Sequence, residues 1–98
     1  MTDAYPIQRE EADGRGRYVA YLPDGSVAEL TYDRRDADTL VADHTGVPPA
    51  YRNAGLALKL VETAMADARR EGTKIVPVCS YVVAQFRRHP EWSDLRAE

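Results

Sequence analysis

The segment VPPAYRNAGLALKL, Val47–Leu60, contains a predicted helix start that is suited to binding an anion. The first backbone N–H groups of a helix have no partner within the helix and carry the positive end of its dipole. Asn53 can cap this helix, and Gly55 has no side chain to obstruct a ligand. The first acidic residue is Glu62, so phosphate groups could approach the backbone without repulsion. The alternative is an ordinary capped helix after a proline-rich loop.

Two other residues could act on a reactive carbonyl group. Cys79 lies between an apolar segment and a predicted helix start, where the helix dipole can lower the pKa of a thiol and favour the thiolate nucleophile. Its alternative role is that of a small buried apolar residue. His44 shares a predicted strand face with Leu40 and Ala42, and it could accept a proton from an incoming amine. A hydrogen-bonded structural histidine is the alternative.

Metal chemistry has little support in the sequence. The chain has one cysteine, and its two histidines, His44 and His89, lie too far apart for a familiar zinc-ligand spacing. We therefore expect no metal site. A single cysteine also excludes an internal disulfide framework.

The elements that must position these residues change type near the middle of the chain. The first half alternates apolar and polar residues, with Ala28, Leu30 and Tyr32 on one predicted face, whereas the second half has helical spacing. We predict an α+β fold, with a mixed, mostly antiparallel sheet, in the order β-β-β-β-α-β-α. The predicted strands are Tyr5–Glu11, Arg17–Leu22, Ser26–Tyr32, Thr39–Val47 and Thr73–Val78, and the predicted helices are Ala54–Glu71 and Ser80–His89.

Local signals indicate where these elements begin and end. Arg34–Asp38 is predicted as a polar turn, and Gly72 as the stop of the first helix. Ser80 is the predicted cap of the second helix, which Pro90 ends. The tail after Pro90 is expected to pack Trp92 against the body of the protein. Tyr18, Tyr21 and Tyr32 are expected to pack in the sheet.

Length and composition limit the possible classes of protein. The 98 residues, 44% apolar and 30% charged, indicate one soluble globular domain over residues 1–98. The chain has neither an apolar run long enough to span a membrane nor a secretory signal, so we expect a cytoplasmic protein without a membrane partner. The net charge of -3, with no clustered basic stripe, argues against a nucleic-acid partner.

Three motifs resemble a known family. RNAGLA, Arg52–Ala57, is similar to the [Q/R]-x-x-G-x-[G/A] signature with which the GNAT superfamily of N-acetyltransferases binds the pyrophosphate of acetyl-CoA. HTGVP, His44–Pro48, and PVCSYV, Pro77–Val82, lie on either side of the helix and resemble the small, single-domain YjdJ-like subfamily. The resemblance covers about residues 17 to 92, with the predicted helix between the flanking motifs.

This resemblance implies a GNAT-like fold that binds acetyl-CoA, or coenzyme A, as its substrate. The strand ending at Val47 would pair its backbone with the pantetheine arm, and Cys79 would lie beside the acetyl group. The residues implied to hold the phosphates are Arg52, Asn53, Ala54, Gly55, Leu56 and Ala57.

The chain departs from the family pattern at two positions. Asn53 stands where the usual loop has a glycine, and asparagine enters the left-handed backbone region more readily than most residues. Larger members often carry a tyrosine on the last helix that protonates the leaving thiolate, but Phe86 stands there in this chain. Tyr81 is a candidate substitute.

The function that we expect is acetyl transfer from acetyl-CoA to an amine. His44 or a water molecule would be the base, and Cys79 would carry the acetyl group in a ping-pong variant. Larger members have helices between their first strands, where this chain has only predicted turns, so the acceptor site should be open and suited to a protein or peptide amine. The alternative is a non-catalytic CoA- or acyl-CoA-binding module, which the missing tyrosine favours.

Overall fold

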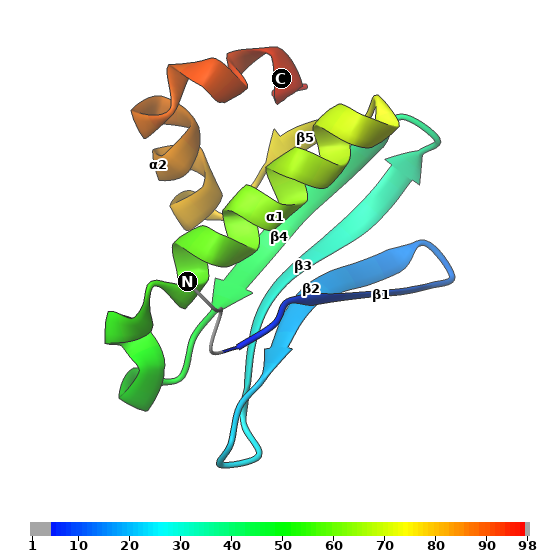
Figure 1. Ribbon diagram of the computed structural model, residues 1–98. Coiled ribbons are helices and arrows are strands. Elements are labelled where there is room, and N and C mark those ends of the chain that lie inside the picture. The colour runs from blue at the N-terminus through cyan, green and yellow to red at the C-terminus, as the bar shows by residue number, and fades with distance from the viewer. Residues whose placement is uncertain (1–4, 98) are drawn as a thin grey trace.

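The computed structural model describes residues 5–97, which form a five-stranded sheet with helices packed on one face (Figure 1). The strands follow the order β1-β2-β3-β4-β5, antiparallel from β1 to β4 and parallel between β4 and β5. The predicted α+β class, mixed sheet and element order are thus confirmed. The strands are β1 Gln8–Ala12, β2 Arg15–Tyr21, β3 Val27–Asp36, β4 Thr39–Gly46 and β5 Lys74–Pro77. The helices are α1 Leu56–Glu71 and α2 Ser80–Arg88, with 3-10 helices η1 Pro49–Ala54 and η2 Pro90–Leu95.

The core lies between the sheet and α1, which crosses the sheet in Figure 1. Two parallel strands need a long crossover connection, and α1 supplies it between β4 and β5. Ala28, Leu30 and Tyr32 are buried on the face toward α1, as their alternation predicted. From α1, the buried residues are Leu56, Leu60, Val61, Ala64, Met65 and Ala68, which repeat with helical spacing.

The C-terminal ends of the two α-helices follow the sequence signals. Gly72 caps the C-terminal end of α1, and α2 gives way to η2 at His89 and Pro90. Trp92 packs against the core from η2, as predicted. The N–H of Ala97 donates to the Ile75 carbonyl at 2.9 Å, so the tail lies beside β5. Within residues 5–97 no helix is long and apolar enough to cross a membrane.

Two predictions for the strands were wrong. The polar turn predicted at Arg34–Asp38 is shorter, because β3 continues to Asp36 and the Arg34 guanidinium pairs with Glu11 at 3.0 Å. Tyr21 was expected to pack in the sheet, but its side chain is 48% exposed. It projects from the face opposite α1, where its hydroxyl donates to Glu10.

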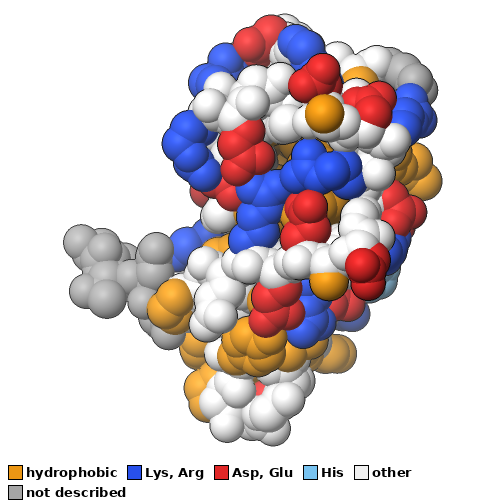
Figure 2. Space-filling view, turned by 90° about the vertical axis from the view of Figure 1, so that its right-hand side faces the viewer, with side chains coloured by type: hydrophobic (Ala, Val, Ile, Leu, Met, Phe, Trp, Pro, Cys, Tyr) orange, Lys and Arg blue, Asp and Glu red, His pale blue; other side chains and the backbone are white. Residues whose placement is uncertain are grey.

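A charged network joins β1 to β3 and α1. The Arg9 guanidinium donates to the Tyr32 hydroxyl at 2.9 Å and to Glu71 at 2.6 Å. The Tyr32 hydroxyl in turn donates to Glu11 at 2.7 Å, which also accepts from Arg34. Figure 2, which views the molecule from the side of the β1–β2 turn, shows acidic and basic side chains interleaved on this surface. The network therefore holds the edge strand β1 against the rest of the sheet.

The Tyr32 ring needs a glycine beneath it. A Cβ atom added to Gly16 would overlap the ring carbons and hydroxyl of Tyr32. Gly16 and Tyr32 are cross-strand partners of β2 and β3. A small residue at position 16 thus lets the Tyr32 hydroxyl reach the carboxylate of Glu11.

Replacement of Glu11 by Gln should make stability less dependent on pH. The hydrogen bonds from Arg34 and Tyr32 lower the pKa of Glu11 from 4.5 to about 2. The ionised carboxylate therefore stabilises the fold above pH 4.5, and this contribution is lost as pH falls toward 2. Allowing for solvent screening, we expect Glu11→Gln to lose about 1–2 kcal/mol at neutral pH.

Urea unfolding at neutral pH and at about pH 2.5 measures this difference. The difference in free energy of unfolding between the wild type and Glu11→Gln should be smaller at the lower pH. Asp38→Asn, a substitution in an exposed turn, should have the same free energy of unfolding as the wild type at both pH values. An equal difference in free energy of unfolding at the two pH values would show that the fold does not stabilise the charged form of Glu11.

Candidate functional site

The start of α1 presents backbone N–H groups without a capping side chain. Gly55, with φ 72° and ψ 18°, is the N-cap residue, and its carbonyl accepts the Lys59 N–H at 3.1 Å. The first turn contains no acid, and a Cβ atom on Gly55 would have no neighbour within 4 Å among the described residues. This turn therefore needs a glycine for its left-handed backbone, and the space beside it is open to a ligand.

The prediction that Asn53 caps this helix was wrong. Asn53 lies inside η1, and it is not among the described residues with positive φ, so it does not provide the left-handed turn. That conformation falls on Gly55 instead. The chain thus enters α1 from a short 3-10 helix that begins with Pro49, since proline favours the first turn of a helix.

Arg52 and Val47 are brought together by η1. The exposed Arg52 side chain turns back, and its Nε donates to the Val47 carbonyl at 3.3 Å. The Tyr51 ring meets Tyr5 edge-on, with the ring centroids 5.7 Å apart, which anchors η1 on the N-terminal segment. The arginine and the end of β4 therefore lie at the same rim.

Beyond this rim, β4 and β5 separate. Their pairing ends at Ala42 and Pro77, and the N–H groups of Val78 and Cys79 both donate to the Ala42 carbonyl. A proline at this point removes one ladder donor, which fits the end of the pairing. A cavity of about 430 Å³ lies at the separation, and it is lined by His44, Thr45, Gly46, Val47, Arg52, Ala57 and Tyr81.

A bulge in β4 changes the face on which His44 lies. Tyr32 pairs with Ala42, but Thr31 pairs with His44, so Asp43 is an extra residue. The Asp43 carboxylate accepts from the Thr31 hydroxyl at 2.5 Å. His44 was predicted to share a face with Leu40 and Ala42, which are buried toward α1. The bulge instead turns His44 to the opposite face, where it is exposed.

The bulge also places Thr45 beside Cys79. Thr45 pairs with the buried Leu30 and so faces α1, and its Oγ1 lies 3.5 Å from the Cys79 Sγ. Cys79 is the N-cap residue of α2, which corrects the prediction that Ser80 caps this helix. Partial burial raises the pKa of Cys79. Hydrogen bonds with the Thr45 hydroxyl and with the N–H groups of Val82, Tyr81 and Thr45 lower this pKa by more than burial raises it. The pKa of this thiol thus lies below its usual value.

The aromatic residues of α2 have different environments. Tyr81 lines the cavity, and partial burial raises its pKa. Phe86 is 6% exposed and belongs to the core, so its position offers no proton donor. Arg87 and Arg88 are exposed on the last turn. Tyr81 is therefore the phenol of α2 that faces the cavity.

The arrangement separates the two candidate catalytic residues. Cys79 lies on the α1 side of β4, in contact with Thr45, whereas His44 lies on the opposite side. Thr45 and His44 both line the cavity beyond Ala42, and Cys79 is not among its lining residues. A thiolate on one side and an imidazole on the other suit an acyl transfer in which donor and acceptor approach from different faces. Residues 5–97 contain no group of His, Cys, Asp and Glu that could hold a metal ion.

Sequence reasoning missed Thr45 and Asp43. Thr45 belongs to the HTGVP motif, but strand alternation from Leu40 would place it on the face away from α1. Only the extra residue Asp43 reverses this assignment, and bulges have no reliable single-sequence signal.

Comparisons with known proteins found a family model and solved structures that are similar to this chain. A family model described as GCN5-related N-acetyl-transferase matches residues 17–95. Among solved structures, a Staphylococcus aureus protein described as GCN5-like has a TM-score of 0.67 at 22% identity, over 92% of this chain and 87% of that chain. Nourseothricin acetyltransferase has a TM-score of 0.57 at 22% identity, over 78% of this chain and 49% of that one, about half its length. No curated protein matches the sequence significantly.

The contact between Thr45 and Cys79 predicts how the thiol titrates. In Thr45→Val the hydroxyl is lost, so the pH midpoint of Cys79 alkylation by iodoacetamide should rise, whereas Thr45→Ser should keep the midpoint. Thr63→Val removes a hydroxyl that bonds only the Lys59 carbonyl, and it serves as the matched control. An unchanged midpoint in Thr45→Val would contradict this role, and Cys79 is the chain's only thiol.

Proposed function

The chain belongs to the GCN5-related N-acetyltransferase family, and we propose that it transfers an acetyl group from acetyl-CoA to an amine acceptor. The observation that carries the proposal is the start of α1, which is free of acids and has no side-chain cap, at the rim of the cavity between β4 and β5. A negatively charged ligand can accept hydrogen bonds from backbone N–H groups of this turn, which no side chain caps.

In this proposal, Arg52, Asn53, Ala54, Gly55, Leu56 and Ala57 hold the pyrophosphate of coenzyme A. Gly55 supports this role because its left-handed turn leaves open space in front of the helix start. Arg52 adds an exposed positive charge, and it can exchange its bond to the Val47 carbonyl for a phosphate oxygen. The end of β4 at Val47 would then pair with the pantetheine amides.

Acetyl-CoA is the substrate that supplies the activated thioester. In direct transfer, the amine nitrogen attacks the thioester carbonyl carbon, the carbon–sulfur bond breaks, and the coenzyme leaves as a thiolate that takes up the proton lost by the acylated nitrogen. His44 or a water molecule accepts the proton that the ammonium group must lose first. Backbone N–H groups of β4 beyond Ala42, where β5 no longer pairs with it, would polarise the carbonyl oxygen.

A ping-pong route is supported by the environment of Cys79. The Cys79 thiolate attacks the thioester carbon, the bond to the coenzyme sulfur breaks, and the acetyl group stays on Cys79. The amine then attacks this second thioester, its nitrogen loses a proton to His44 or a water molecule, and the bond to the Cys79 sulfur breaks to regenerate the thiolate. Thr45 and the N–H groups of α2 stabilise a thiolate at this position.

A non-catalytic CoA-binding module is the second candidate. The buried Phe86 favours it, because this position of α2 cannot protonate a leaving thiolate. Tyr81 lines the cavity, and in an enzyme its phenol could take the place of the missing proton donor. The two candidates differ in whether acetyl-CoA is consumed when an amine is present.

Binding of the coenzyme should depend on the charge at position 52. Arg52→Glu places a carboxylate beside the phosphates, so affinity for acetyl-CoA in native mass spectrometry or calorimetry should fall by roughly tenfold or more. Arg69→Glu makes the same charge change at the other end of α1 and should leave affinity within about twofold.

Equal affinities in the wild type and Arg52→Glu would place the phosphates elsewhere. No complex with acetyl-CoA at concentrations of hundreds of micromolar would contradict both the enzyme and the binding module.

The carrier role of Cys79 predicts a covalent intermediate. After incubation with acetyl-CoA, intact-mass analysis should show one acetyl group that hydroxylamine removes, as expected for a thioester. Cys79→Ala should lack this adduct and lose the ping-pong route. Turnover that is unaffected in Cys79→Ala would exclude the carrier role and leave direct transfer.

A further inference from the structure

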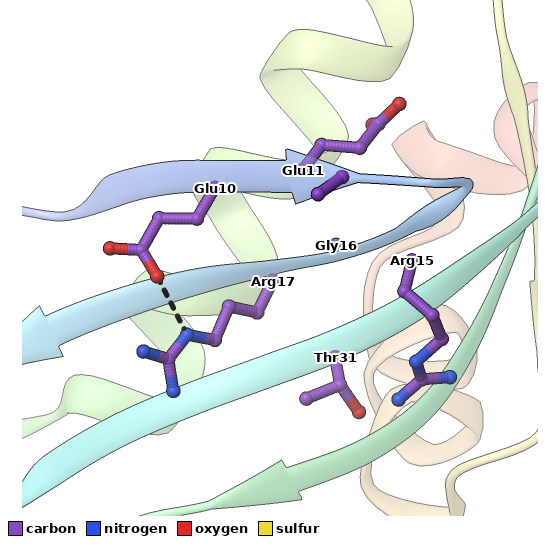
Figure 3. Close-up of a pocket in the computed structure, with 7 residues that line it drawn as sticks. Glu10, Glu11, Arg15, Gly16, Arg17 and Thr31 are labelled. Atoms are coloured by element: carbon purple, nitrogen blue, oxygen red, sulfur yellow. Dashed lines mark hydrogen bonds and ion pairs between the residues drawn. The ribbon is translucent and has the colours of Figure 1, made fainter.

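The face of the sheet opposite α1 carries two similar charged groups. This open face, seen in Figure 3 with the helices behind the strands, presents Glu10, Arg15, Arg17 and Thr31 toward the viewer. No described helix covers it, since the buried apolar side chains of α1, α2 and η2 all join the core on the other face. The bulge at Asp43 places His44 on this same face, paired with Thr31.

Two arginines of β2 on the open face, Arg15 and Arg17, are each shared by two carboxylates. Arg17 pairs with Glu10 at 2.9 Å and with Glu29 at 2.8 Å. Arg15 pairs with Asp33 at 2.9 Å and with Asp43 at 2.6 Å. Within each of these groups of three side chains, the carboxylates outnumber the arginine by one.

A cavity of about 400 Å³ lies between these two groups. Its lining includes Arg15, Arg17 and Thr31, with Gly16 at its base. Arg15 and Arg17 alternate along β2, so the two groups are about 7 Å apart along the strand. Thr31 borders this cavity, and its cross-strand neighbour His44 lines the cavity at the β4–β5 gap, about 5 Å away between Cβ atoms. His44 thus links the two cavities.

We propose that the open face is the acceptor surface and that it binds a basic, lysine-containing segment of another protein. This inference rests on the proposed acetyl transfer. The excess carboxylate at each group attracts one cationic side chain of the partner, and the two sites match alternate residues of an extended chain. The acceptor lysine would then reach the gap past His44, on the side away from Cys79.

A protein segment fits this surface better than a small amine. Small-molecule sites bury most of their ligand in an enclosed pocket, but Arg15 and Asp33 each keep 53% of their side chains exposed. An extended segment instead spreads its contacts over a shallow surface.

Two peptides test the proposal, and each contains one lysine. In the arginine peptide, the alternate positions beside the lysine are arginine, and in the serine peptide they are serine. We expect the arginine peptide to have a KM about fivefold lower, with similar kcat. The double variant Glu10→Gln with Asp33→Asn leaves each arginine one carboxylate. Its KM for the arginine peptide should therefore rise to that for the serine peptide, while its KM for the serine peptide stays as in the wild type. The control double variant, Glu91→Gln with Asp94→Asn, makes the same charge change on η2 and should keep the lower KM for the arginine peptide.

Peptide binding, measured by fluorescence anisotropy, keeps the test independent of turnover. The arginine peptide should bind the wild type and the η2 double variant more tightly than the Glu10 and Asp33 double variant, and the difference should shrink at high salt. Equal binding to all three proteins would overturn the acceptor surface. Binding of acetyl-CoA, measured separately by native mass spectrometry, shows whether the proposed function itself fails.

Discussion

The extra residue Asp43 in β4 determines how the candidate site is built. Its carboxylate is held on the open face by the Thr31 hydroxyl and by Arg15, so the register shift is fixed by side chains of two other strands. Because side chains alternate along a strand, one added residue moves every later residue to the other face. Thr45 therefore meets Cys79, and His44 faces solvent on the far side.

The parallel pairing of β4 and β5 supplies the second part of the site. Both strands end at the same edge of the sheet, and each leads toward the N-terminus of a helix, α1 after β4 and α2 after β5. Two helix starts therefore bring the positive ends of their dipoles to one edge, where they favour negative charge. Past Ala42 the two strands separate and no longer share ladder hydrogen bonds, so the cavity lies between them at this edge.

Much of the fold could be predicted because each signal was local. Alternation at Ala28 and Leu30, the stop at Gly72 and the break at Pro90 depend on nearby residues alone. The RNAGLA motif likewise indicated the family that the comparisons then showed. The orientation of His44 could not be predicted in this way, since it depends on a register shift between two strands.

The central claim is that acetyl-CoA binds at the start of α1 and along the gap between β4 and β5. NMR chemical-shift mapping tests it directly, because each backbone amide reports on its own surroundings. On addition of acetyl-CoA, the largest amide shifts should fall on residues 45–57 and around Tyr81, with small shifts on β1 and β2. Shifts confined to the open face around Arg15 and Arg17, or the absence of any shift, would contradict the account.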